Sequence, residues 1–385
     1  MRPSIANPVI SNHRQAQSRV GTKSEDVMTR HLPPRAARGI AIATVFVALS
    51  ANSSALNTVV LGGLDGPRGL AVGPAGRLIF GEFNGSFSEL IARGNLAGAA
   101  RSLGSVPGTY IAPAVATGGG QTFILVANGA PGTGANTLYQ VTNGTVRALA
   151  DIAAYQRTDP DPYDLDDPPF PEESNPFGVA ALQDGSALVA DAAANDLLRV
   201  YPNGKIVTVA RLKPRVVPWP TGLPFGPPPG TPVPSEEVAT SVAVGADGYY
   251  YVGELRGFPA TPGTSQIWRI APNSVNALCD SDAPTTGPCQ RYADGFTSIV
   301  DLEGGPDGSL YVVELAKSSW FQSPLGIGGP SVGSVIRLLP GGGRVELAPG
   351  ELTLPSGVAV TGDNSVYVSS PVFSDFGPGT IRQIQ

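Results

Sequence analysis

Residues with a side-chain oxygen recur at one position of a repeated sequence pattern. The six positions are Glu82, Asn128, Asp191, Glu254, Glu314 and Ser370. Oxygen atoms of this kind are the ligands that Ca²⁺ prefers. If the copies of the pattern meet at one rim, the four carboxylates are candidate metal ligands with Ca²⁺ as the candidate cofactor, and Asn128 and Arg68 lie at the same rim.

These carboxylates also allow an interpretation without a metal. A side chain that recurs in each repeat can cap a turn or accept backbone N–H bonds within its own repeat. Arg68 could neutralise part of the charge at the rim without any ion. The sequence leaves both interpretations open.

The pattern itself predicts paired strands. Each copy is a short apolar strand, a turn and a second strand rich in β-branched or aromatic residues. Three copies have Asp-Gly at the turn, which favours a tight hairpin because glycine tolerates positive φ. The copies span residues 67–82, 113–128, 176–191, 239–254, 297–314 and 355–370, and the second of them is degenerate.

A second hairpin follows most of the copies. It is clear in LYQVTNGTVRALA from residue 138, LLRVYPNGKIVTVA from 197 and VIRLLPGGGRVELA from 335. Six copies with four strands each predict an all-β fold, a six-bladed β-propeller. The strands are apolar at successive positions, as expected where both faces are buried between neighbouring blades.

The two ends of the sequence predict how the ring closes. The last copy ends at TIRQIQ, a third strand without a fourth, and NTVVLGGL from residue 57 is a strand without a hairpin of its own. We expect residues 58–61 to pair beside 380–384 as the outermost strand of the last blade, which removes two open sheet edges. The propeller would then span residues 56–385.

Residues 1–55 are predicted to be a signal peptide with a polar upstream extension, and Met28 is an alternative start. A segment with three arginines precedes the mostly apolar run 39–51, and small residues follow up to Ala55. This run is shorter than the ~20 residues of a membrane-spanning helix. We therefore expect a secreted or periplasmic protein with no transmembrane anchor after cleavage.

The charge and residue types after residue 55 exclude several classes of function. The first 55 residues contain seven of the 25 Lys and Arg, two of the 31 Asp and Glu, and both histidines. The remainder carries 18 basic and 29 acidic residues, a net charge of −11, so nucleic acid is excluded as a partner. Without histidine it cannot form a Ser-His-Asp triad or a histidine-ligated zinc or haem site.

Cys279 and Cys289 are the only cysteines, ten residues apart in a loop rich in Gly, Pro and Asp. Two close thiols pair in an oxidising compartment, whereas a reactive thiol would need a histidine to activate it. We expect a disulfide between them, in the loop between the third and fourth strands of the fourth blade.

Two insertions have unusual compositions. Residues 159–173 contain seven carboxylates, which form either a solvated loop or a site for a cation or basic partner. Residues 213–234 contain nine prolines together with Trp219 and Phe225. Such a segment is typical of a stiff loop across the ring mouth or of a polyproline docking segment.

Several stretches resemble the ScyD/ScyE family of exported propellers, and the hairpins are similar to NHL repeats in general. The stretches are VATSVAVGADGYYYVGELRGFP (238–259), DGFTSIVDLEGGPDGSLYVVEL (294–315), SNPFGVA (174–180) and DGPRGLAVGPAG (65–76). The resemblance covers about residues 57–385. It implies a propeller fold and export, and it implies no set of catalytic residues.

Two functions of different class are consistent with these features. The first is a non-catalytic binding or scaffold protein that holds a small-molecule or protein ligand at the propeller mouth. The second is a divalent-cation-dependent, lactonase-like hydrolase with a carboxylate-lined central channel, similar to gluconolactonase-type propellers, in which a central cation polarises a carbonyl or activates water. We favour the first because the rim residues are shared by the repeats instead of clustering in one asymmetric site.

Overall fold

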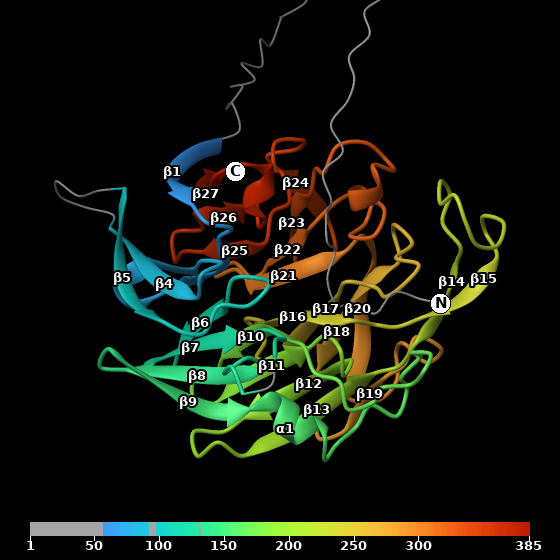
Figure 1. The fold of residues 1–385 in the computed structure, drawn as a ribbon, viewed down its shortest axis with the longest axis horizontal. Helices are drawn as coiled ribbons and strands as arrows, with labels where there is room; N and C mark the ends of the chain where they lie inside the picture. Colours follow the sequence, from blue (N-terminus) through green and yellow to red (C-terminus); the bar gives the residue numbers. More distant parts are fainter. Residues whose placement is uncertain (1–56, 92–97, 131) are drawn as a thin grey trace, which may run out of the picture. The chain divides into compact units, whose positions relative to one another are not determined.

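The computed structural model describes residues 57–91, 98–130 and 132–385. In this part of the chain, six small antiparallel sheets form a ring (Figure 1), which confirms the predicted all-β, six-bladed propeller. The predicted signal peptide, residues 1–55, lies outside the described residues. No helix in the described ranges is long and apolar enough to span a membrane.

The first three blades contain the strands from β2 to β13. The first blade is β2 (Arg68–Val72), β3 (Leu78–Gly81), β4 (Ser86–Ile91) and β5 (Ala99–Ser105); the second is β6 (Ala114–Gly118), β7 (Gln121–Val126), β8 (Thr137–Thr142) and β9 (Thr145–Asp151); the third is β10 (Pro176–Ala181), β11 (Ala187–Asp191), β12 (Asp196–Val200) and β13 (Ile206–Leu212). A short helix, α1 (Ile152–Gln156), follows β9, with Asp151 as its N-cap.

The other three blades complete the ring. The fourth is β16 (Ala239–Val244), β17 (Tyr250–Glu254), β18 (Ser265–Ile270) and β20 (Cys289–Phe296); the fifth is β21 (Ile299–Gly304), β22 (Leu310–Glu314), β23 (Ser334–Leu338) and β24 (Arg344–Leu347); the sixth is β25 (Gly357–Val360), β26 (Val366–Ser370), β27 (Gly379–Ile384) and β1 (Asn57–Leu64). Three single turns of 3₁₀-helix lie in loops: η1 (Pro74–Gly76), η2 (Ser323–Leu325) and η3 (Ser374–Phe376).

The first strand of each blade is the inner one. The six inner strands, β2, β6, β10, β16, β21 and β25, each contact the inner strands of both neighbouring blades. Glycine allows this close approach, because a Cβ atom on Gly178 would lie 2.7 Å from the carbonyl oxygen of Thr240 in the next blade. The second strands β11, β17 and β22 are buried at every residue. Their apolar residues therefore pack against a neighbouring blade on each side.

The ring closes as the chain ends predict. Strand β1 pairs antiparallel with β27, with Thr58 opposite Gln383 and Gly62 opposite Thr380. It is the outermost strand of the sixth blade (Figure 1). Leu61 and Leu64 are buried against the sixth and first blades.

The disulfide between Cys279 and Cys289 is confirmed, with 5.1 Å between the Cα atoms. Cys279 lies between the third and fourth strands of the fourth blade, as predicted, but this connection contains a short strand that we did not predict. Cys279 ends a short strand, β19 (Ala277–Cys279), which pairs in parallel with β13 of the third blade. Cys289 begins β20 of the fourth blade, so the bond links two neighbouring blades.

The proline-rich insertion forms a separate hairpin of β14 (Arg215–Pro218) and β15 (Pro232–Ser235). Its two aromatic residues contact rings from the segments that follow β17 and β22. Trp219 meets Phe258 edge to face at 5.4 Å, and Phe225 meets Phe321 at 6.3 Å. The insertion therefore packs against the segments that follow β17 and β22. Its place across the ring mouth and its use as a docking segment both stay predictions.

A chain that begins at Gly66 should be less stable than one that begins at Asn57. It loses β1, exposes the edge of β27 and loses the burial of two leucines, which together stabilise the fold by roughly 3 kcal/mol or more. We expect a melting temperature several degrees lower and a greater tendency to aggregate, measured by calorimetry and light scattering. Equal melting temperatures would contradict the role of β1 in closure.

Candidate functional site

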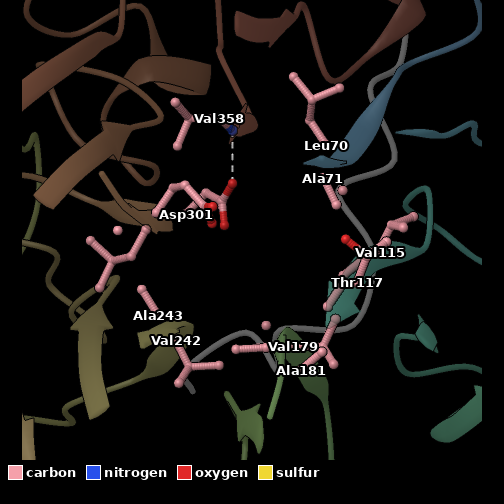
Figure 2. Close-up of a pocket in the computed structure, with 18 of the residues that line it drawn as sticks. Leu70, Ala71, Val115, Thr117, Val179, Ala181, Val242, Ala243, Asp301 and Val358 are labelled. Carbon is pink, nitrogen blue, oxygen red and sulfur yellow. Dashed lines mark hydrogen bonds between the residues drawn. The ribbon is translucent and has the colours of Figure 1, made fainter. Parts of the chain in front are cut away.

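The inner strands line a cavity at the centre of the ring, which we call the central channel. Its volume is about 280 Å³, and residues of all six inner strands contribute to its wall (Figure 2). The lining residues are mostly small or aliphatic, but Leu70, Val242 and Val358 are at most 4% exposed, so backbone atoms and polar side chains form much of the surface that faces the cavity. Among the described lining residues, three carry charge: Arg68, Asp301 and Glu303.

Asp301 and Glu303 belong to β21. They are two residues apart, so their side chains leave the same face of the strand. An oxygen of Asp301 accepts the backbone N–H of Val358 in the sixth blade at 2.8 Å (Figure 2). Within the described part of the chain, no hydrogen bond or ion pair engages the carboxyl group of Glu303.

Burial changes the acidity of both carboxyl groups. It raises the pKa of Asp301 to about 7, against the opposing effects of the Val358 N–H and the charge of Arg68. It raises the pKa of Glu303 to about 8, and the charge of Asp301 adds to this shift. Groups that titrate near neutral pH in a cavity are candidates for binding or proton transfer.

Arg68 lies at the start of β2 and is only 3% exposed. Its guanidinium donates to the carbonyl oxygens of Ala112, at 3.1 Å, and of Phe177. It also stacks on the Phe177 ring, 3.8 Å from the centroid. Burial lowers the pKa of Arg68 to about 10, opposed by the charge of Asp301. Arg68 thus joins the first blade to the next two.

The four predicted metal ligands occupy equivalent places at the ends of the second strands, and none lines the central channel. Each accepts a backbone N–H group at hydrogen-bonding distance. The donors are Asp65 to Glu82 (3.0 Å), Asn175 to Asp191 (2.7 Å), Gln266 to Glu254 (3.1 Å) and Thr297 to Glu314 (2.6 Å). The alternative of a hydrogen-bonding role within each repeat therefore accounts for their contacts.

Asn128 takes part in a similar local network. Its backbone N–H donates to the side chain of Asn175 at 3.2 Å, and its side-chain oxygen accepts from Asn136 at 3.5 Å. The described residues contain no group of three or more His, Cys, Asp or Glu placed to hold a metal ion. The Ca²⁺ site stays a prediction, with no such group to support it in the described part of the chain.

Asp301 and Glu303 were missed at the sequence level although a signal was present. The inner strands of the fourth and sixth blades read ATSVAV and GVAV, whereas that of the fifth reads IVDLEG. Two charges in a strand that is apolar elsewhere are costly unless they face a cavity or a partner. This departure from the repeat was the clue to the site.

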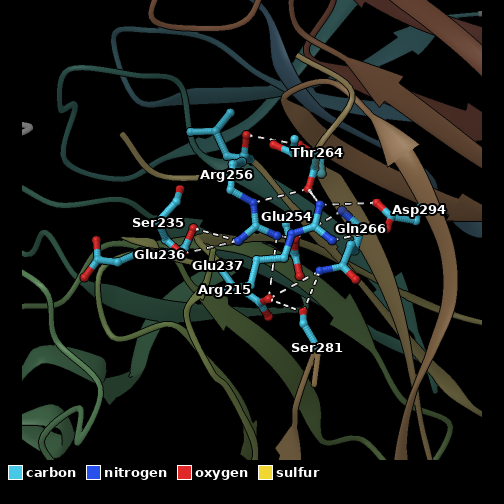
Figure 3. Close-up of polar contacts among 12 residues, drawn as sticks. Arg215, Ser235, Glu236, Glu237, Glu254, Arg256, Thr264, Gln266, Ser281 and Asp294 are labelled. Atoms are coloured by element: carbon cyan, nitrogen blue, oxygen red, sulfur yellow. Dashed lines mark hydrogen bonds and ion pairs between the residues drawn. The ribbon is translucent and has the colours of Figure 1, made fainter. Parts of the chain in front are cut away.

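A second charged group is fully buried in the fourth blade. Glu237, Glu254 and Arg256 are each at most 1% exposed. Arg256 binds Glu254 and lies 3.6 Å from Glu237 (Figure 3). Glu254 also accepts a hydrogen bond from the indole N–H of Trp268. Arg256 further donates to the carbonyl oxygen of Thr264 at 3.2 Å, which ties the segment after β17 to the blade.

This network holds two carboxyl groups for one arginine. One oxygen of Glu237 accepts from Ser281 at 2.7 Å, while Oε2 has no hydrogen-bond partner among the described residues. Burial, together with the charge of Glu254, raises the pKa of Glu237 well above its ordinary value. The neutral form of Glu237 is therefore favoured, and the network is closed to solvent.

Comparisons with known proteins identify the fold alone. No family model and no curated protein matches the sequence. Among solved structures, the chain is similar to a glucose dehydrogenase at 13% identity, with a TM-score of 0.54 over 86% of this chain and 99% of that one. It is also similar to the PQQ-bound aldose sugar dehydrogenase from Streptomyces coelicolor (12%, 0.50, 85% and 96%) and to a gluconolactonase from Xanthomonas campestris (10%, 0.50, 86% and 91%).

Replacing Arg256 by methionine should destabilise the protein by about 3–5 kcal/mol, because a buried carboxylate loses its partner. Glu237→Gln should cost less at pH 7, because the raised pKa of Glu237 already favours its neutral form. Chemical denaturation of both variants measures the difference. Similar losses for the two would show that the arginine has no special role.

Thermal stability should also depend on Glu303 above neutral pH. The native state holds a proton that the unfolded chain releases near the ordinary pKa of about 4.3. The stabilisation that this proton gives the native state is fully present below about pH 4.3. It is lost as the pH rises through about 8. Glu303→Gln should therefore raise the melting temperature relative to wild type more at pH 8.5 than at pH 5.5. A difference that does not change with pH would contradict the raised pKa.

Proposed function

We propose that the protein is an exported propeller of the ScyD/ScyE type that binds a small molecule in its central channel without catalysing a reaction. The observation that carries this proposal is the pair Asp301 and Glu303 in a cavity at the centre of the ring. A concave site with a few placed polar side chains is typical of ligand binding. The volume of about 280 Å³ is small for such sites and favours a ligand smaller than a typical drug.

The hydroxyl groups of the wall support binding over covalent catalysis. Thr117 donates to the carbonyl oxygen of Val72, and Ser356 donates to that of Pro67 at 2.8 Å. A nucleophilic hydroxyl would instead be bonded to a general base. The lactonase-like alternative requires a bound divalent cation, and no observation in the channel favours it over binding.

Export is supported by the signal-peptide pattern and by the disulfide, which persists in oxidising compartments. Secretion or a periplasmic location would place the channel where it meets small extracellular compounds. The family resemblance adds the same expectation and names no ligand.

Crystals of the protein soaked with a fragment library should show fragments in the central channel. A matched variant, Ala181→Phe, adds a ring at the wall and should exclude them. Because Ala181 also packs against the core of the second and third blades, the melting temperature of the variant is the control for its fold. Fragments that bind only at other surfaces would overturn the proposal. Hydrolysis of lactones that depends on Ca²⁺ and is lost in Ala181→Phe would instead establish the alternative.

A further inference from the structure

The central channel has more negative than positive charge available to a ligand. Its described lining contains two carboxyl groups and one guanidinium. The guanidinium of Arg68 already donates to two carbonyl oxygens and stacks on Phe177. No ion pair links it to either carboxyl group among the described residues. Arg68 is therefore not free to neutralise them by direct contact.

The carboxyl oxygens of Asp301 and Glu303 can also accept further hydrogen bonds from a ligand. Asp301 accepts a side-chain-to-backbone hydrogen bond from Val358, and Glu303 has no such bond in the described part of the chain. An ammonium group has three N–H donors and no acceptor, so it complements this pair. A carboxylate or phosphate ligand would instead be repelled by the charged forms of both side chains.

We propose that the central channel binds a small ammonium ion, with its nitrogen at Asp301 and Glu303. This inference rests on the proposed function and specifies its ligand class. Val179, which is partly exposed, provides some apolar surface at the channel for a short hydrocarbon part (Figure 2). A polycationic or peptide ligand does not fit, because the cavity is small and its remaining wall offers no further acidic side chain among the described residues.

Binding of the ammonium ion should release protons. The free carboxyl groups hold protons near neutral pH because of their burial, and a bound cation favours their charged forms. Affinity should therefore increase from about pH 6 to about pH 8.5, below the pKa of about 10.4 that is typical of an alkylammonium group. A neutral ligand would show no comparable dependence.

Calorimetric titration with hexylammonium chloride, 1-hexanol and sodium hexanoate tests this inference. Hexylammonium should bind most tightly, and its binding enthalpy should vary with the ionisation enthalpy of the buffer because protons are released. Glu303→Gln should weaken its binding by about tenfold or more, as expected when one partner of a desolvated charge pair is lost. Glu172→Gln makes the same chemical change at an exposed position and should bind like wild type.

Other results would overturn the inference. If 1-hexanol or hexanoate binds as tightly as hexylammonium, or if both glutamine variants bind like wild type, the ligand is not a cation held by Glu303. The proposed function would survive that result, since the fragment soaks test it separately. Binding of CaCl₂ that requires Glu303, without binding of hexylammonium, would make the channel a metal site. Absence of binding by all these probes at millimolar concentration would also reject the ammonium ligand.

Discussion

Six inner strands surround one axis so closely that several positions have no room for a side chain. A Cβ atom on Gly69 would lie 2.5 Å from the carbonyl oxygen of Pro113, and one on Gly357 would lie 3.1 Å from the backbone nitrogen of Leu70. Both contacts join neighbouring blades. This spacing sets the width of the central channel and brings Asp301 of the fifth blade next to Val358 of the sixth. The site therefore depends on the closure of the whole ring.

The carboxyl groups of the protein occupy two environments with different consequences. At the ends of the second strands, Asp191 and Glu314 are enclosed by donors of their own blade, which oppose part of the rise in pKa that burial causes. In the central channel, Glu303 has no such compensation within the described residues. An uncompensated acid destabilises the fold, and proteins retain such groups mainly where they serve a function.

The repeat predicts the fold well because each blade must bury both faces of its strands. Apolar runs separated by turn residues indicate this requirement in the sequence. Closure by residues 57–64 was predictable for the same reason, since an unpaired strand needs an edge. The site was less predictable. Glu82 and Asp191 occupy the same position of the repeat. That position alone does not show whether a side chain accepts nearby backbone N–H groups or lines the channel. A β-bulge between Ile299 and Asp301 also changes the direction of side chains locally, and β19 was hidden because its partner is in another blade.

The pairing of β1 with β27 has a consequence for the order of folding. Arg382 donates a hydrogen bond to Asn57 across 325 residues of chain, so the last blade cannot form before the final strand has been synthesised. Contacts so distant in sequence are slow to form. A chain that crosses a membrane from its N-terminus would keep β1 unpaired until its last residues emerged on the far side. If the chain is exported as we propose, the topology of the ring would delay completion of the fold until β27 has crossed.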